Sequence, residues 1–265
     1  MTSATAAPLP PETAAPQPIR GWVLLATPVV GALVFAVVLT LLVLAAFLLH
    51  AITLQGGPGG VIRQLQSNYL LLMGIAALLY LAIFFAAWLL LPKHGPASLQ
   101  SYFPPVPVRM LAVGVGSGLF LVVLVLPVVA IASKVFHIDL PATDQEKALL
   151  PHNLVQLAAL LGMGAVAAPL VEELYFRGLF LRWLRKRWGL ILSAVVNVVI
   201  FAALHGRFIE YPGPAGFAVT AGLCVPATVL VILAVRSGSL WPGVIAHGTY
   251  NAILLVLSYL QPNLG

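Results

Sequence analysis

WVLLATPVVGALVFAVVLTLLVLAAFLL, residues 22–49, contains no charged side chain and no histidine. A helix of roughly 20 consecutive apolar residues is long enough to cross the hydrocarbon core of a bilayer. The stretch therefore predicts a membrane-spanning helix. It is too long for the apolar core of a signal peptide, which spans roughly 7–15 residues, so we expect it to remain as an anchor.

Similar apolar runs recur along the whole chain of 265 residues. The composition is 61% hydrophobic and only 8% charged, whereas a soluble domain carries roughly 25% charged residues. The sequence therefore predicts an all-α, polytopic transmembrane helical bundle with about seven to eight spanning helices. After the first span we expect helices at 69–91, 110–132, about 154–181, about 190–204, about 217–235 and about 240–260.

The chain divides into three predicted parts. Residues 1–19 are rich in Ala and Pro and predict a disordered tail. Residues 20–149 predict membrane-anchoring helices, in which Gly114 and Gly118 form a small-xxx-small pair typical of helix contacts. Residues 150–265 contain spans with ionisable side chains and predict a catalytic helical core.

The net charge is +6, but the basic residues are scattered between apolar runs and form no stripe. This pattern argues against a nucleic-acid partner and favours contact with the lipid bilayer. Most Lys and Arg residues that flank the expected spans fall on one side, chiefly through RWLRKR, residues 182–187. The positive-inside rule then places the N-terminus in the cytoplasm. The tail and the compact motifs fit a bacterial inner (plasma) membrane protein.

VEELYFRG, residues 171–178, places three charges in an apolar segment. Glu173 and Arg177 are four residues apart on the expected helix, so their side chains can pair. Glu172 points about 100° away from Glu173 and has no partner in its own helix. A lone carboxylate in an apolar site suits a general base that activates water. Pro169 either opens the helix beside Glu172 or makes an ordinary packing kink.

Two further motifs carry polar groups on later helices. In HGTYN, residues 247–251, His247 and Asn251 share one helix face. In FAALH, residues 201–205, the ring of Phe201 can pack against His205. Glu172 and His205 lie at similar distances from the basic turn near residue 188, so an antiparallel hairpin would place them at a similar depth. Together these residues favour a functional site over a purely structural role.

The series EExxxR, FxxxH and HxxxN on successive apolar helices resembles the CAAX protease and bacteriocin-processing family of intramembrane proteases, which includes type 2 CAAX prenyl endopeptidases. The resemblance covers roughly residues 150–260. It implies an all-helical membrane fold with a cavity inside the bilayer. It also implies that Glu172 and His205 activate water, that His247 and Asn251 stabilise the oxyanion, and that Glu173 and Arg177 support the site.

The family is commonly labelled as metalloprotease, and Glu172, His205 and His247 could together hold zinc with water in the open position. The sequence contains no HExxH motif, however. If Glu172 binds a metal, it is not free to act as the base. The sequence therefore leaves two alternatives, zinc or no cofactor, and favours metal-free hydrolysis.

The predicted function is an intramembrane endopeptidase that acts on a membrane-associated protein or peptide. In a bacterium, prenylated substrates are disfavoured, and peptide maturation, bacteriocin immunity or processing of a membrane partner fit better. One alternative is a non-enzymatic immunity or scaffold protein of the same fold. Another is a proton-coupled transporter, which would favour repeated halves, whereas the ionisable groups gather in one half here.

Overall fold

A computed structural model describes residues 20–48, 68–95, 97–136, 150–205 and 213–260. Within these ranges the regular elements are helices, and the chain contains no strand there. The predicted all-α bundle is therefore confirmed for the described residues. The predicted tail at residues 1–19 lies outside them.

The helices follow the predicted runs closely. Asn68 and Asn153 each cap the helix that follows, because their side-chain oxygens accept the backbone N–H of Leu71 and Gln156. In chain order the elements are α1 (Gly21–Leu48), α3 (Tyr69–Leu90), η1 (Leu99–Tyr102), α4 (Val108–Phe136), α6 (Leu154–Leu161), η2 (Gly162–Ala167), α7 (Ala168–Glu173), η3 (Leu174–Phe180), α8 (Leu181–Leu204), α10 (Pro214–Ser237) and α11 (Trp241–Leu260).

Six helical units in the described residues are long and apolar enough to cross a membrane. One of them, Leu154–Leu204, has 51 residues, far more than the roughly 20 that a single crossing needs. It folds back at Gly189, whose φ of 69° is outside the helical range. The unit therefore has two arms, so the described helices come close to the about seven to eight spans predicted. The chain is an integral membrane protein.

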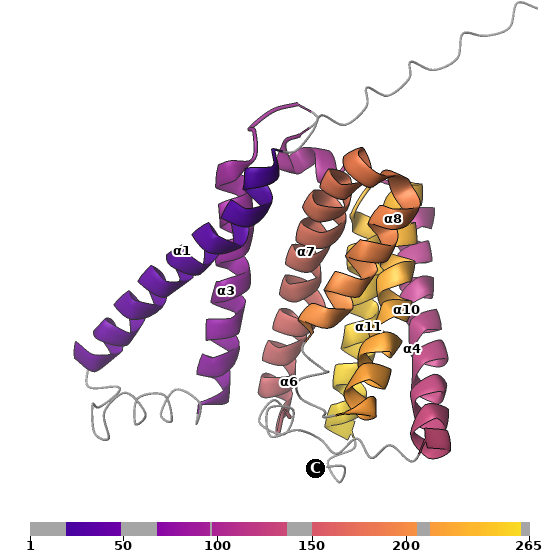
Figure 1. The fold of residues 1–265 in the computed structure, drawn as a ribbon. Coiled ribbons are helices and arrows are strands. Elements are labelled where there is room, and N and C mark those ends of the chain that lie inside the picture. The colour runs from indigo at the N-terminus through magenta and orange to yellow at the C-terminus, as the bar shows by residue number, and fades with distance from the viewer. Residues whose placement is uncertain (1–19, 49–67, 96, 137–149, 206–212, 261–265) are drawn as a thin grey trace, which may run out of the picture.

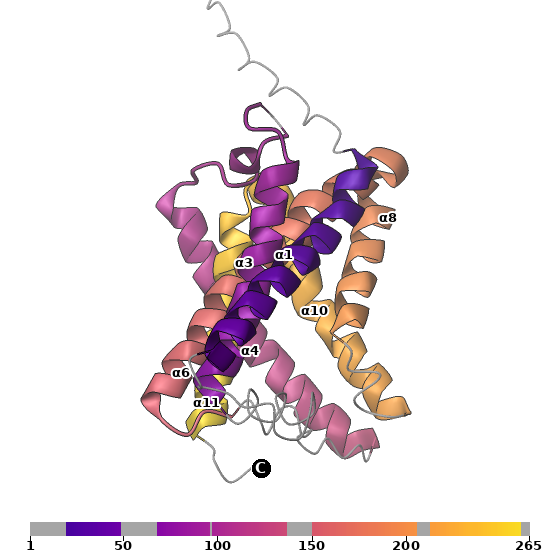
Figure 2. The ribbon, with the colours of Figure 1, turned by 90° about the vertical axis from the view of Figure 1, so that its left-hand side faces the viewer.

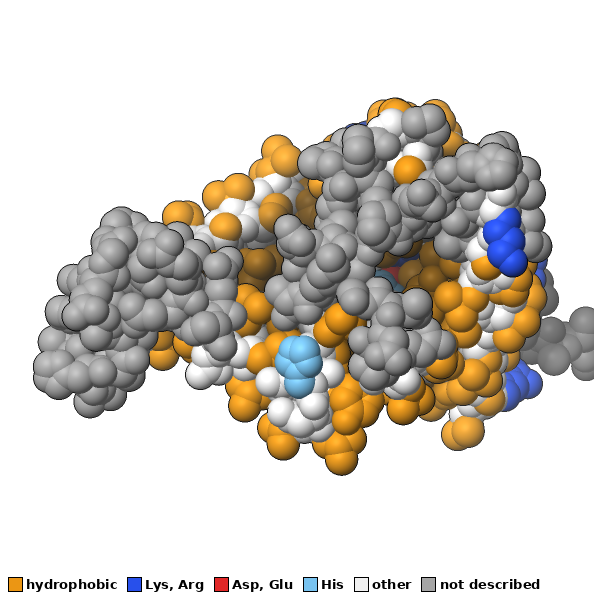
Figure 3. Space-filling view, turned by 90° about the horizontal axis from the view of Figure 1, so that it is seen from below, with side chains coloured by type: hydrophobic (Ala, Val, Ile, Leu, Met, Phe, Trp, Pro, Cys, Tyr) orange, Lys and Arg blue, Asp and Glu red, His pale blue; other side chains and the backbone are white. Residues whose placement is uncertain are grey.

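The helices form two groups that meet along α3 (Figures 1 and 2). α1 packs on α3, and α3 in turn contacts α6, η2 and α7. α10 lies against α8 and α11, and α11 also packs along α4. Figure 3 shows the lower end of the bundle, where hydrophobic side chains make up much of the described surface. Large hydrophobic side chains are also exposed along the spans, as expected for helices that face lipid.

The predicted glycine contact joins α4 to α11. A Cβ atom added to Gly118 would lie 2.6 Å from the carbonyl oxygen of Ala246, and one added to Gly114 would lie 2.8 Å from the carbonyl oxygen of Pro242. Both distances are shorter than any ordinary contact, so only glycine allows the two backbones to approach this closely. The seam fixes the position of α11, which carries His247.

We expect Gly118→Ala to lower the free energy of unfolding by about 1–3 kcal/mol, because the new methyl group meets backbone that cannot move aside. Gly116→Ala on the same helix is the matched control, since a Cβ there meets nothing within 4 Å. Thermal unfolding in detergent measures both variants. Equal stability of the two would contradict this account of the seam.

Candidate active site

The arm that carries Glu172 is a continuous helix whose hydrogen-bond register changes. The short α-helix α7 lies between two π-helical segments, η2 and η3. In η2 the N–H of Ala168 donates to the carbonyl of Met163, five residues earlier. In the same register the next residue, Pro169, would donate to the carbonyl of Gly164, but proline has no N–H. The amide of Asn251 on α11 donates to the Gly164 carbonyl instead, at 2.8 Å. The structure thus places a change of register directly before Pro169, with α11 supplying the missing donor.

A second asparagine binds the other π-helical segment. The side-chain amide of Asn197 on α8 is fully buried and donates to the carbonyl of Phe176 in η3, at 2.8 Å. π-helical turns recur at functional sites, because they shift side chains relative to an ordinary helix. Glu172 lies between the two segments, so both asparagines hold the backbone that positions it.

The predicted ion pair between Glu173 and Arg177 is present and buried, with 3.1 Å between Arg177 Nη1 and Glu173 Oε1. Arg177 also donates from Nη2 to the carbonyl of Ala227, and its guanidinium lies 4.1 Å from the ring centroid of Phe201. Glu173 Oε1 also accepts a hydrogen bond from His247 Nδ1 at 3.2 Å. The pair therefore joins the arm to α10, α8 and α11.

Glu172 has two oxygens in different surroundings. Oε1 accepts a hydrogen bond from the hydroxyl of Tyr80 on α3, at 3.0 Å. Oε2 is buried and has no hydrogen-bond partner among the described residues. The nearest ring nitrogen of His247, Nε2, lies 3.9 Å from Oε2. The carboxylate is thus held on one side and unsatisfied on the other.

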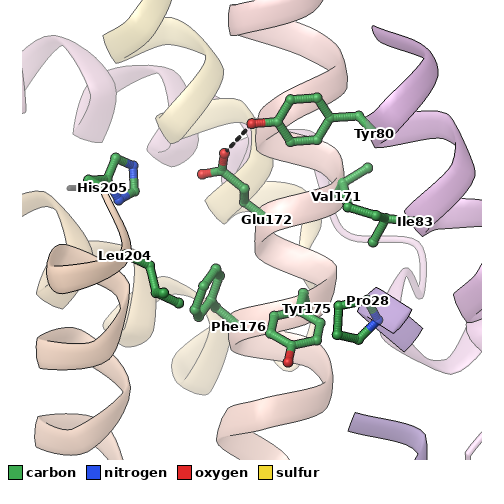
Figure 4. Close-up of a pocket in the computed structure, with 9 residues that line it drawn as sticks. All are labelled: Pro28, Tyr80, Ile83, Val171, Glu172, Tyr175, Phe176, Leu204 and His205. Carbon is green, nitrogen blue, oxygen red and sulfur yellow. Dashed lines mark hydrogen bonds between the residues drawn. The ribbon is translucent and has the colours of Figure 1, made fainter. Parts of the chain in front are cut away.

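Glu172 and His205 line the same cavity of about 340 Å³ (Figure 4). His205 Nδ1 donates to the carbonyl of Phe201 at 2.8 Å, which leaves Nε2 without a proton in the neutral ring. The predicted packing of Phe201 on His205 is present, with ring centroids 4.5 Å apart. The remaining lining is mostly apolar and comes from Pro28, Tyr80, Ile83, Val171, Tyr175, Phe176 and Leu204.

The structure thus brings together three of the four residues predicted to be catalytic. Glu172 and His205 share the cavity, and His247 reaches Glu172 from α11. Asn251 contacts the Gly164 carbonyl and is not among the residues that line the cavity. The sequence analysis missed Tyr80 and Asn197. Each is an uncharged side chain that can form hydrogen bonds inside an apolar helix, and that property could have indicated it. The sequence analysis used this signal only for ionisable residues and for the HGTYN motif.

Glu172, His205 and His247, the possible zinc ligands, are not grouped as a metal site in this arrangement. Within the ranges that the structure describes, no three His, Cys, Asp or Glu side chains are grouped closely enough to hold a metal ion. We therefore derive no step through zinc. A carboxylate oxygen without a hydrogen-bond partner, beside an imidazole in a small apolar cavity, is suited to binding and deprotonating water.

Residues 154–253 match the family described as type II CAAX prenyl endopeptidase Rce1-like. The match begins at the start of α6 and includes Glu172, His205, His247 and Asn251. Searches of curated proteins and of solved structures gave no match.

The contact between Asn251 and Gly164 predicts a dependence on Pro169. Asn251→Leu should destabilise the fold by about 1–3 kcal/mol, because the half-buried Gly164 carbonyl loses its donor inside an apolar bundle. In a Pro169→Ala background the restored N–H can donate to that carbonyl, so the same substitution should cost much less. Thermal unfolding of the two single variants and the double variant in detergent tests this. Equal losses in both backgrounds would show that Asn251 does not replace the missing N–H.

Proposed function

We propose that this chain, whose residues 154–253 form a domain of the Rce1-like family, is an intramembrane endopeptidase that hydrolyses a membrane-associated protein or peptide. The observation that carries the proposal is that Glu172, whose Oε2 atom lacks a hydrogen-bond partner within the described chain, lines the same cavity as His205. Glu173 also has one buried carboxylate oxygen without a partner among the described residues, so the cavity is what distinguishes Glu172 from its neighbour.

In the proposed reaction Glu172 acts as the general base. Its Oε2 takes a proton from a water molecule as the water oxygen attacks the carbonyl carbon of the peptide bond. Nε2 of His205 can accept a hydrogen bond from the same water, because its Nδ1 proton is committed to Phe201. Collapse of the tetrahedral intermediate breaks the C–N bond, and the proton held by Glu172 passes to the departing amine.

His247 and Asn251 are the proposed donors to the oxyanion. Because Glu173 is a carboxylate and can only accept, the Nδ1 atom of His247 must carry a proton. Nε2 then faces the Glu172 side, and it can donate to an oxyanion when the ring carries both protons. The Asn251 amide has two N–H groups and uses one for Gly164, so the second remains for this role.

The basic ends of the helices support a cytoplasmic N-terminus. One end of the bundle, at the top of Figure 1, holds the first residues of α1 and α4 and the last residues of α3 and α10. The turn within α8 lies at the same end (Figure 1). The Lys and Arg residues close to these ends are Arg20, Lys93, Arg109, Arg182, Arg185, Lys186, Arg187 and Arg236. Such a concentration of positive charge favours the cytoplasmic side, here proposed as that of a bacterial inner membrane.

Glu172→Gln should lower cleavage by at least about a hundredfold while the protein still folds, because the amide cannot act as a base. Glu173→Gln is the matched contrast. It should also lower stability, since it leaves Arg177 buried without its ion-pair partner. Mass spectrometry of membrane peptides and new C-termini, in cells that express wild type or variant at equal levels, measures cleavage. Thermal unfolding in detergent measures stability.

Fragments that appear with wild type and vanish with Glu172→Gln would establish proteolysis and reveal the cleavage position. Identical peptide profiles from the two folded proteins, with the physiological partner present, would refute the enzymatic proposal. That outcome would favour a non-enzymatic immunity or scaffold protein.

A further inference from the structure

We propose that Tyr80 is a positioning residue for Glu172, selecting which carboxylate oxygen is left to act on water. The inference rests on the proposed function of Glu172 as a base. Tyr80 lies on α3, outside the 154–253 segment that matches the family. The predicted anchoring part of the chain would thus supply a side chain to the reaction.

The contact is specific in both position and chemistry. Tyr80 is far from Glu172 in the sequence, and its hydroxyl donates to Oε1 at 3.0 Å. Both residues line the cavity, together with Ile83 one helical turn further along α3 (Figure 4). Aliphatic and aromatic side chains make up most of the span around Tyr80, from Tyr69 to Leu90. A hydroxyl placed there needs a buried acceptor, and the Glu172 carboxylate is the acceptor it meets.

This hydrogen bond makes the two oxygens of Glu172 unequal. With Oε1 held by Tyr80, Oε2 lies on the side of the carboxylate toward His205 (Figure 4). The terminal torsion of a glutamate has a broad energy profile, so packing alone holds the carboxylate plane weakly. The phenol supplies the missing restraint. Without it the carboxylate would rotate away from the orientation in which Oε2 lies toward His205 (Figure 4) and 3.9 Å from His247 Nε2.

Tyr175 provides a matched control within the same cavity. It also lines the cavity and also donates its hydroxyl, but to the backbone carbonyl of Leu24 on α1, at 3.2 Å. Its hydroxyl points away from Glu172 in Figure 4. Tyr80→Phe and Tyr175→Phe therefore each remove one hydroxyl from a tyrosine of the cavity wall, and only the first changes the surroundings of the carboxylate.

The test measures kcat and KM of the full-length chain in detergent, on a peptide that spans the cleavage position found with wild type. Tyr80→Phe should lower kcat about tenfold to a hundredfold and leave KM within about twofold, because orientation of the base changes and substrate binding does not. Tyr175→Phe should keep kcat within about twofold of wild type. Replacing Tyr80 by para-aminophenylalanine, which keeps an N–H donor at the same ring position, should restore most of the lost kcat.

Three results would overturn the inference. The first is a kcat of Tyr80→Phe equal to that of Tyr175→Phe, and the second is an effect of Tyr80→Phe on KM alone. The third is a failure of para-aminophenylalanine to restore kcat. Failure of the proposed function is recognised separately, since wild type would then show no Glu172-dependent cleavage. In that case thermal unfolding of Tyr80→Phe, Glu172→Gln and the double variant tests whether Tyr80 and Glu172 interact. A double shift in Tm smaller than the sum of the single shifts supports the contact, and additive shifts refute the inference.

Discussion

Inside a bilayer a polar group that lacks an internal partner has no water to replace it, and this constraint explains most of the polar contacts in the structure. Arg177 is neutralised by Glu173 and donates to Ala227, while Asn197 and Asn251 donate to carbonyls of the π-helical segments. The ion pair lies within one arm, but the bonds to Ala227, Phe176 and Gly164 join different helices, so these polar groups hold the apolar bundle in one arrangement. Glu172 differs from these residues because it lines the cavity.

Much of this architecture could be predicted from residue spacing alone. The apolar runs gave the helix limits to within a few residues, since the length of a span depends on hydrophobicity and bilayer thickness. The i, i+4 spacing predicted the pair of Glu173 and Arg177, and the glycine spacing predicted a close helix contact, although not its partner α11. These features depend on a single helix and its period, which the sequence displays directly.

The features that could not be predicted depend on contacts between distant segments. No periodicity indicates that Tyr80 reaches Glu172, or that Asn251 donates to a carbonyl left without a donor by Pro169. The π-helical register of η2 and η3 was also unforeseen, because a shift from i+4 to i+5 bonds leaves little trace in the hydrophobic pattern. The candidate site thus contains the predicted ionisable residues, and the neutral side chains that orient them emerged only from the three-dimensional structure.

The cavity has walls of two origins. Glu172 and His205 come from the arms of one folded-back helical unit, whereas Pro28, Tyr80 and Ile83 come from α1 and α3. The proposed reacting groups and the opposite wall can therefore change separately in evolution. A different pair of first helices on the same later segment would keep Glu172 and His205 and give the cavity another wall. Such a division would let related proteins acquire new substrates without rebuilding the chemistry.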